Sequence, residues 1–215
     1  MFNESGPWKR DLAAAAGRLE EFRLGLASEF EQGEGTDSEF DIVSEAIYQV
    51  ERNVIFGTFA VRRLLGMPSK VTKSARATKA TVMRFSLRPG EEAPDQWDIF
   101  GDLEMYEMST PEVETISANA MCNLFVHSLI LRLAWSHHGL SWFDYWKLPE
   151  NDPRIEAKPT ELAGLLVASD KSSMNHLTFV SLDELIRVFL TLANDEVTKL
   201  DSHRDRLGRM HISVT

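Results

Sequence analysis

The chain has 215 residues, 43% of them hydrophobic and 26% charged, which is typical of one globular domain with a sizeable core. Its 23 Lys and Arg against 33 Asp and Glu give a net charge of −10, which disfavours non-specific nucleic-acid binding by the molecule as a whole. No apolar run approaches the roughly 18 to 20 residues of a membrane span, the first residues lack the apolar core of a signal peptide, and the single cysteine excludes an internal disulfide, so the sequence predicts a cytoplasmic protein without membrane contact.

The first third of the chain carries two amphipathic helical patterns. Between about residues 9 and 30, apolar residues recur every three or four positions, as on one face of a helix. A break with two glycines ends this pattern. Thr36, with Glu39 three residues later, forms a capping box for a second helix, which should run to about Leu65 before a glycine and a proline stop it.

The middle of the chain is less regular. Residues 79–87 alternate between apolar and polar side chains, which indicates a strand with one solvated face. Residues 88–102, rich in proline and glycine, predict a surface loop. Thr110 followed by Pro111 is a helix start, because proline suits the first helical position, and we expect a third helix to continue to about Ser136.

The last third combines aromatic, strand and helix signals. Aromatic side chains crowd residues 135–146, where they would close the core or, alternatively, stack on bases. Two apolar runs around a polar loop predict a β-hairpin near residues 164–181. Ser181 and Glu184 then form the capping box of a last helix.

Together these elements predict a mainly α fold. We expect one domain at residues 1–200, a bundle of four to five helices with a small β-hairpin, followed by a loosely ordered tail at residues 201–215. The long apolar stripes at residues 40–65 and 110–136 exceed what one small bundle covers, which predicts a two-fold homodimer.

Charge is segregated along the sequence. Residues 52–90 contain nine Lys and Arg and no acid, whereas residues 89–131 contain nine Asp and Glu and no Lys or Arg. The two segments could neutralise each other, or the basic one could form an anion-binding face for a phosphate backbone. The second interpretation predicts an RNA-binding surface that includes Arg52, Lys70, Lys73, Arg76 and Lys79.

Most catalytic motifs are absent from the sequence. It has no glycine-rich phosphate loop, no nucleophile elbow and no His-Glu-x-x-His pair. His127, His137 and His138 lack acidic partners at ligand spacing, so we expect no metal site and no cofactor. Asn123 and His127 lie one turn apart on the expected third helix, where they either bond to each other inside the core or act as an acid–base pair.

The segment that holds this pair resembles a known motif. Residues 122–127, Cys-Asn-Leu-Phe-Val-His, resemble the motif of HEPN domains, helical bundles in which an arginine, a polar residue, three variable residues and a histidine form an RNA-cleaving site. The asparagine and histidine match, and Cys122 stands in place of the arginine. The resemblance covers about residues 38–136, including the long helix before the motif.

The resemblance implies a function in stress response or phage defence. It implies metal-independent cleavage of RNA at a site completed by two subunits, with His127 as general acid or base. On this basis Cys122→Arg should raise cleavage if the side chain faces the same cleft. We therefore expect an HEPN-like, RNA-associated homo-oligomer with ribonuclease activity as one outcome, and a non-enzymatic dimeric scaffold as the alternative.

Overall fold

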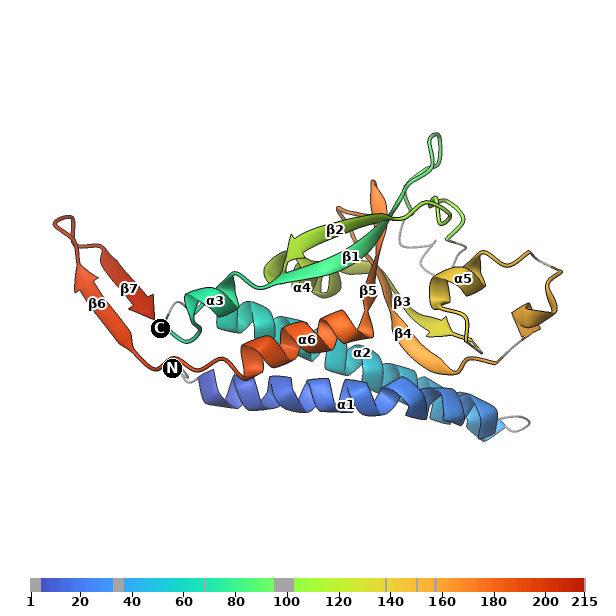
Figure 1. Cartoon of the computed structure of the whole chain (residues 1–215), viewed down its shortest axis with the longest axis horizontal. Helices are drawn as coiled ribbons and strands as arrows, with labels where there is room; N and C mark the ends of the chain where they lie inside the picture. Colours follow the sequence, from blue (N-terminus) through green and yellow to red (C-terminus); the bar gives the residue numbers. More distant parts are fainter. Residues whose placement is uncertain are drawn as a thin grey trace.

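A computed structural model describes residues 5–32, 37–67, 69–94, 103–137, 139–149, 151–156 and 158–214. Within these residues the chain forms long helices, a five-stranded antiparallel sheet and a separate two-stranded hairpin, as Figure 1 shows. The architecture is α+β, and the prediction of a mainly α bundle of four to five helices is wrong.

The two N-terminal helices form an antiparallel hairpin. Helix α1 spans Ser5–Gln32 and α2 spans Asp37–Leu65, close to the ranges that the periodicity predicts. Their facing sides contribute fully buried residues such as Leu19 of α1 and Val54 of α2 to one core. Both helices keep a polar side, and none of the described helices is long and apolar enough to cross a membrane.

The sheet contains five strands in the order β2-β1-β5-β4-β3, with every neighbouring pair antiparallel. The strands are β1 Lys79–Ser86, β2 Glu112–Ser117, β3 Ser128–Ser136, β4 Glu161–Ser169 and β5 His176–Ser181. The strand predicted at 79–87 and the hairpin predicted near 164–181 are confirmed as β1 and as β4 with β5. Helices α1, α2 and α6 lie together on one side of this sheet (Figure 1).

The third helix predicted for residues 110–136 is wrong. Its range is divided among strand β2, the short helix α4 (Ala118–Val126) and strand β3. Strand β2 pairs with β1, and the Ser117 hydroxyl then accepts a hydrogen bond from the Ala120 amide at 3.1 Å to cap α4. Strand pairing between distant residues therefore outweighs the local signal for a helix start. The apolar stripe at residues 110–136, one of the two from which the sequence predicts a dimer, does not lie on one continuous helix.

A second core lies on the other face of the sheet. Helix α5 (Trp142–Trp146) covers it, and the Trp142 ring stacks on Phe179 of β5 with ring centroids 4.8 Å apart. Phe85 of β1 and Tyr106 are fully buried in the same cluster. The aromatic segment thus closes a core, and its most buried tryptophan is not available to bases.

The C-terminal elements begin with a capped helix. Helix α6 (Leu182–Ala193) starts where the capping box predicts, with the Ser181 hydroxyl accepting from the Glu184 amide at 3.2 Å. Strands β6 (Leu200–Arg204) and β7 (Met210–Val214) form a hairpin that projects from the rest of the molecule in Figure 1. The tail predicted for residues 201–215 therefore contains regular structure. The short helix α3 (Lys73–Arg76) and a 3₁₀ turn at Pro153–Glu156 complete the described elements.

Candidate functional site

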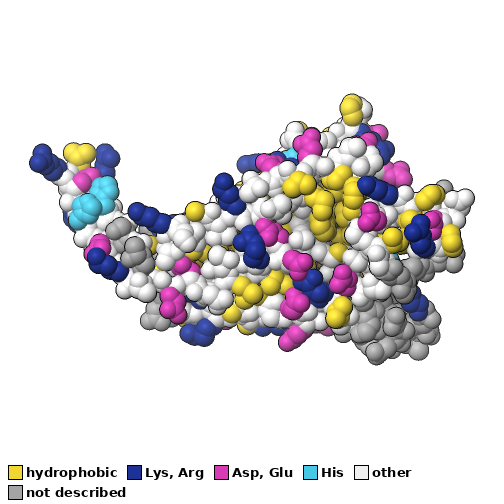
Figure 2. All heavy atoms as spheres, in the orientation of Figure 1, with side chains coloured by type: hydrophobic (Ala, Val, Ile, Leu, Met, Phe, Trp, Pro, Cys, Tyr) yellow, Lys and Arg dark blue, Asp and Glu magenta, His cyan; other side chains and the backbone are white. Residues whose placement is uncertain are grey.

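The antiparallel pairing of β1 with β2 brings part of the basic segment against part of the acidic one. Arg84 forms an ion pair with Glu114, and the Arg88 Nε atom lies 3.7 Å from a Glu107 carboxylate oxygen. Mutual neutralisation, one of the two interpretations of the charge segregation, therefore occurs at this edge of the sheet. On the face shown in Figure 2, side chains of both signs are likewise mixed.

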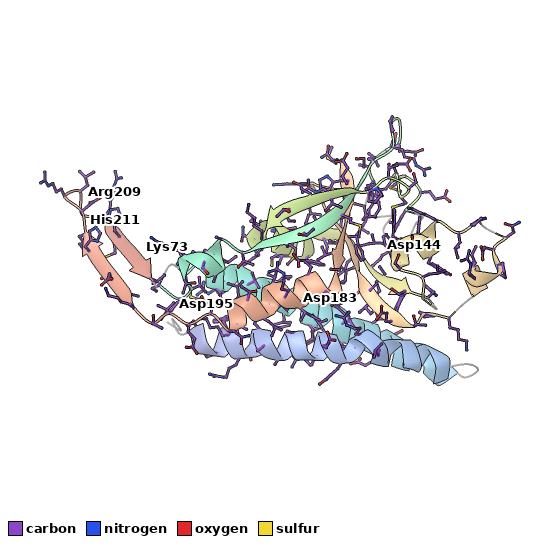
Figure 3. The ribbon with its side chains drawn as sticks, viewed as in Figure 1. Lys73, Asp144, Asp183, Asp195, Arg209 and His211 are labelled. Carbon is purple, nitrogen blue, oxygen red and sulfur yellow. The ribbon has the colours of Figure 1, made fainter. Side chains whose placement is uncertain are left out.

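The predicted RNA-binding residues divide into two groups. Lys70, Lys73, Arg76 and Lys79 lie on or beside helix α3, whereas Arg52 lies in the middle of α2. Asp195 holds the start of α3: its carboxylate accepts hydrogen bonds from the backbone amide of the N-cap, Thr72, at 2.9 Å and from the Thr72 hydroxyl at 2.6 Å. Figure 3 shows Lys73 on α3 and Asp195 beyond the end of α6. The start of helix α3 is thus fixed to the segment that follows α6.

The Asn123–His127 pair predicted from the sequence lies on α4 and its C-cap, not inside a long helix. His127 is exposed, and its ring makes no hydrogen bond or ion pair with the described residues. The side-chain oxygen of Asn123 is buried and has no hydrogen-bond partner in the described part of the chain. The structure therefore does not join the two side chains by a hydrogen bond.

Cys122, at the position of the HEPN arginine, faces the core. Its side chain is fully buried, and burial raises the pKa of the thiol to about 12. An arginine there would bury a charge among apolar side chains and would not share a cleft with the exposed His127. The condition under which Cys122→Arg should raise cleavage is therefore not met. Among the described residues no group of three metal-ligating side chains gathers either.

The outer side of α2 carries a pattern that the sequence analysis missed. Tyr48, Arg52, Phe56, Phe59 and Arg63 follow one another at spacings of four, four, three and four residues, so they share one face of the helix. The three aromatic side chains are 54%, 64% and 49% exposed, respectively, and both arginines are exposed. We call these five residues the arginine–aromatic stripe. Its spacing was present in the sequence, but the buried stripe of the same helix carried the stronger apolar signal.

Two hollows flank the stripe. The first, which we call the arginine pocket, has a volume of about 650 Å³ and lies between the end of α2, α3 and the start of α4. Its lining consists of Phe59, Arg62, Arg63, Leu65, Gly66, Arg76, Ser117 and Asn119. The second, of about 370 Å³, is a groove between α1 and α2 that includes Arg18, Arg52 and Phe56.

The lining of the two hollows is mainly basic although the protein is acidic. The described residues that line the two hollows include five arginines and one acid, Asp11. Arg62 and Arg63 form no ion pair or hydrogen bond through their side chains in the described part of the chain. The Arg52 guanidinium lies over the Phe56 ring, 5.7 Å from its centroid. This cation–π contact leaves a positive group next to an exposed aromatic face.

Comparison of the chain with protein-family models, with curated proteins and with solved structures gives no match.

Proposed function

We propose that this protein binds single-stranded RNA along the arginine–aromatic stripe and does not cleave it there. The observation that carries the proposal is the row of three exposed aromatic side chains and two exposed arginines on one helix face. Exposed rings stack on unpaired bases, worth about 1 to 3 kcal/mol per base, and arginines neutralise the phosphates between them. A cytoplasmic location, which the single reduced cysteine indicates, is part of this proposal.

Binding without catalysis follows from what surrounds the stripe. None of the described residues that line the two hollows is a histidine, and His127 lies instead at the junction of α4 and β3. General acid–base catalysis needs a proton-transfer group within hydrogen-bond reach of the scissile bond. In the described lining the one carboxylate is Asp11, in the groove between α1 and α2, and no histidine accompanies it, so we assign binding and not cleavage to this face.

The alternative occupant of this face is a second copy of the chain. A two-fold interface places the same patch of each subunit against its partner. Arg52 and Arg63 would then meet the same positive patch, and burying guanidinium groups without an opposite charge is costly. A polyanion removes that cost, which favours RNA over a homodimer at this face.

The test is fluorescence anisotropy with a labelled single-stranded oligouridylate of about 12 nucleotides over a range of salt concentrations. Phe56→Ala should weaken binding about tenfold without changing the salt dependence, because it removes one stacking surface. Arg52→Gln should lower the slope of log affinity against log salt by about 0.7, since one phosphate contact is lost.

Matched substitutions away from the stripe are the controls. Trp146→Ala removes an exposed aromatic from α5, and Lys171→Gln removes an exposed charge from the β4–β5 turn. Both should leave affinity unchanged. The proposal is abandoned if the parent protein binds no RNA at low salt, or if the controls weaken binding as much as Phe56→Ala. A dimer that Phe56→Ala dissociates, in a protein without RNA affinity, would support the scaffold alternative.

A further inference from the structure

We infer that the arginine pocket holds a terminal phosphate of the RNA, a phosphomonoester, in preference to the internal diester phosphates. The inference rests on the RNA binding proposed above and specifies which part of the strand the pocket takes. The pocket adjoins one end of the arginine–aromatic stripe, with Phe59 and Arg63 belonging to both. A strand lying along the stripe would therefore reach the pocket with one of its ends.

Three arginines from two separate elements belong to the lining of the pocket. Arg62 and Arg63 are neighbours in the last turn of α2, and Arg76 comes from α3. The Arg76 Nη2 atom donates to the backbone carbonyls of Met67 at 3.4 Å and Val71 at 3.3 Å, and these hydrogen bonds hold the Arg76 side chain in place. The arginine from α3 is therefore held in place before a ligand arrives. The two arginines from α2 can bind a phosphate without first breaking an ion pair with a described residue.

The charge of the pocket matches a monoester better than a diester. A phosphomonoester carries about −1.5 to −2 at neutral pH and offers three terminal oxygens, whereas an internal diester carries −1 and offers two. Guanidinium groups bind such oxygens through paired, charge-assisted hydrogen bonds. A third arginine adds little to the binding of an internal phosphate, which has one negative charge. Three arginines around one pocket therefore favour binding of the terminal phosphate.

The remaining lining residues fit a nucleotide attached to that phosphate. Ser117 is the N-cap of α4 and Asn119 lies in its first turn, at the positive end of the helix dipole, which adds to the field of the arginines. Phe59 presents a half-exposed ring on which the terminal base can stack. The volume of about 650 Å³ lies in the range of small-molecule sites and exceeds the needs of phosphate alone.

The experiment compares three forms of one oligouridylate of about 12 nucleotides, carrying a 5′-phosphate, a 3′-phosphate or neither. One phosphorylated form should bind about tenfold more tightly than the unphosphorylated form, and which one it is identifies the strand polarity. The preference should shrink toward about pH 5, because the monoester takes up a proton below its second pKa near 6 and then carries about the same charge as a diester.

Variants separate the pocket from the rest of the stripe. Arg62→Gln should abolish the preference while leaving affinity for the unphosphorylated strand nearly unchanged. Arg63→Gln, at an exposed position on α2, should also abolish it. Arg52→Gln, outside the pocket, should weaken the binding of all three oligonucleotides by one common factor and leave the preference for the phosphorylated form unchanged.

The outcomes distinguish this inference from the proposed function. Equal affinity for all three strands overturns the terminal-phosphate site and leaves RNA binding in place. A preference that survives in both Arg62→Gln and Arg63→Gln also overturns it, because the phosphate would then be held elsewhere. If no strand binds the parent protein, the RNA proposal falls and the inference falls with it.

Discussion

Gly57 offers a stringent test of how α2 packs against α6. It is buried in the middle of α2, and a Cβ atom added there would lie 2.1 and 2.3 Å from two ring atoms of Phe189. Phe189 is fully buried on α6, so neighbouring side chains restrict the movement of its ring. We therefore predict that Gly57→Ala destabilises the protein although alanine is the better helix former.

The magnitude follows from two opposing effects. Alanine in place of glycine within a helix gains about 1 kcal/mol of helix propensity. Overpacking a filled core costs about 1 to 3 kcal/mol, and contacts near 2 Å belong at the upper end of that range. The free energy of unfolding from urea denaturation should thus fall by about 1 to 2 kcal/mol. Gly17→Ala on α1, where an added Cβ meets nothing within 4 Å, should instead raise it by about 0.5 to 1 kcal/mol.

A double-mutant cycle tests the cause. Phe189→Leu removes the ring atoms that the new methyl group meets, so Gly57→Ala should cost at least about 0.5 kcal/mol less in that background. If Gly57→Ala proves as stable as the parent, or if the two substitutions are additive, the packing of α2 on α6 described above is incorrect.

Three further predictions concern other parts of the fold. Burial raises the pKa of Cys122 to about 12, so iodoacetamide at about pH 8 should modify the thiol only after urea unfolds the chain, and rapid modification of the folded protein would contradict its placement. Hydrogen bonds from the side chain and backbone of Arg154 lower the pKa of Asp152 to about 2, so NMR titration of Arg154→Ala should show this pKa rising toward about 3.9, and an unchanged value would exclude the pair. Because the pKa is lowered on folding, any stability from this pair is present above about pH 4 and is lost as the pH falls toward 2. Ser181→Ala should lower the free energy of unfolding by about 1 kcal/mol through loss of the α6 cap, and no change would show that the cap is dispensable.

Local patterns determined a large part of the fold. The helices α1, α2 and α6 and the strands β1, β4 and β5 all lie where periodicity and caps predict them. In each case the signal sits within the element itself, as a repeat of apolar residues or a hydroxyl at the N-cap, and needs no partner elsewhere in the chain.

The segment from 110 to 136 could not be assigned in the same way. Four of the six residues of β2 are exposed in a row, because β2 is an edge strand whose faces are poorly covered. Its strand character comes from pairing with β1, in which Ser117 lies opposite Lys79. Strand β3, also at an edge, is half-buried on both faces and shows no alternation. The spacing of the apolar residues in this segment therefore resembles that of a helix, and only the pairing of the strands shows that it is not one.

For the candidate site, the sequence by itself determined the net charge, the basic segment and the face of α2 on which each side chain lies. Only the tertiary structure decided which positive groups keep their charge unpaired. Pairing of β1 with β2 places Arg84 beside Glu114, and the adjoining segments bring Arg88 to Glu107. Arg62 and Arg63 instead line a pocket whose described residues include no acid. The reason is that ion pairing depends on distances between residues far apart in the chain, which local patterns do not carry.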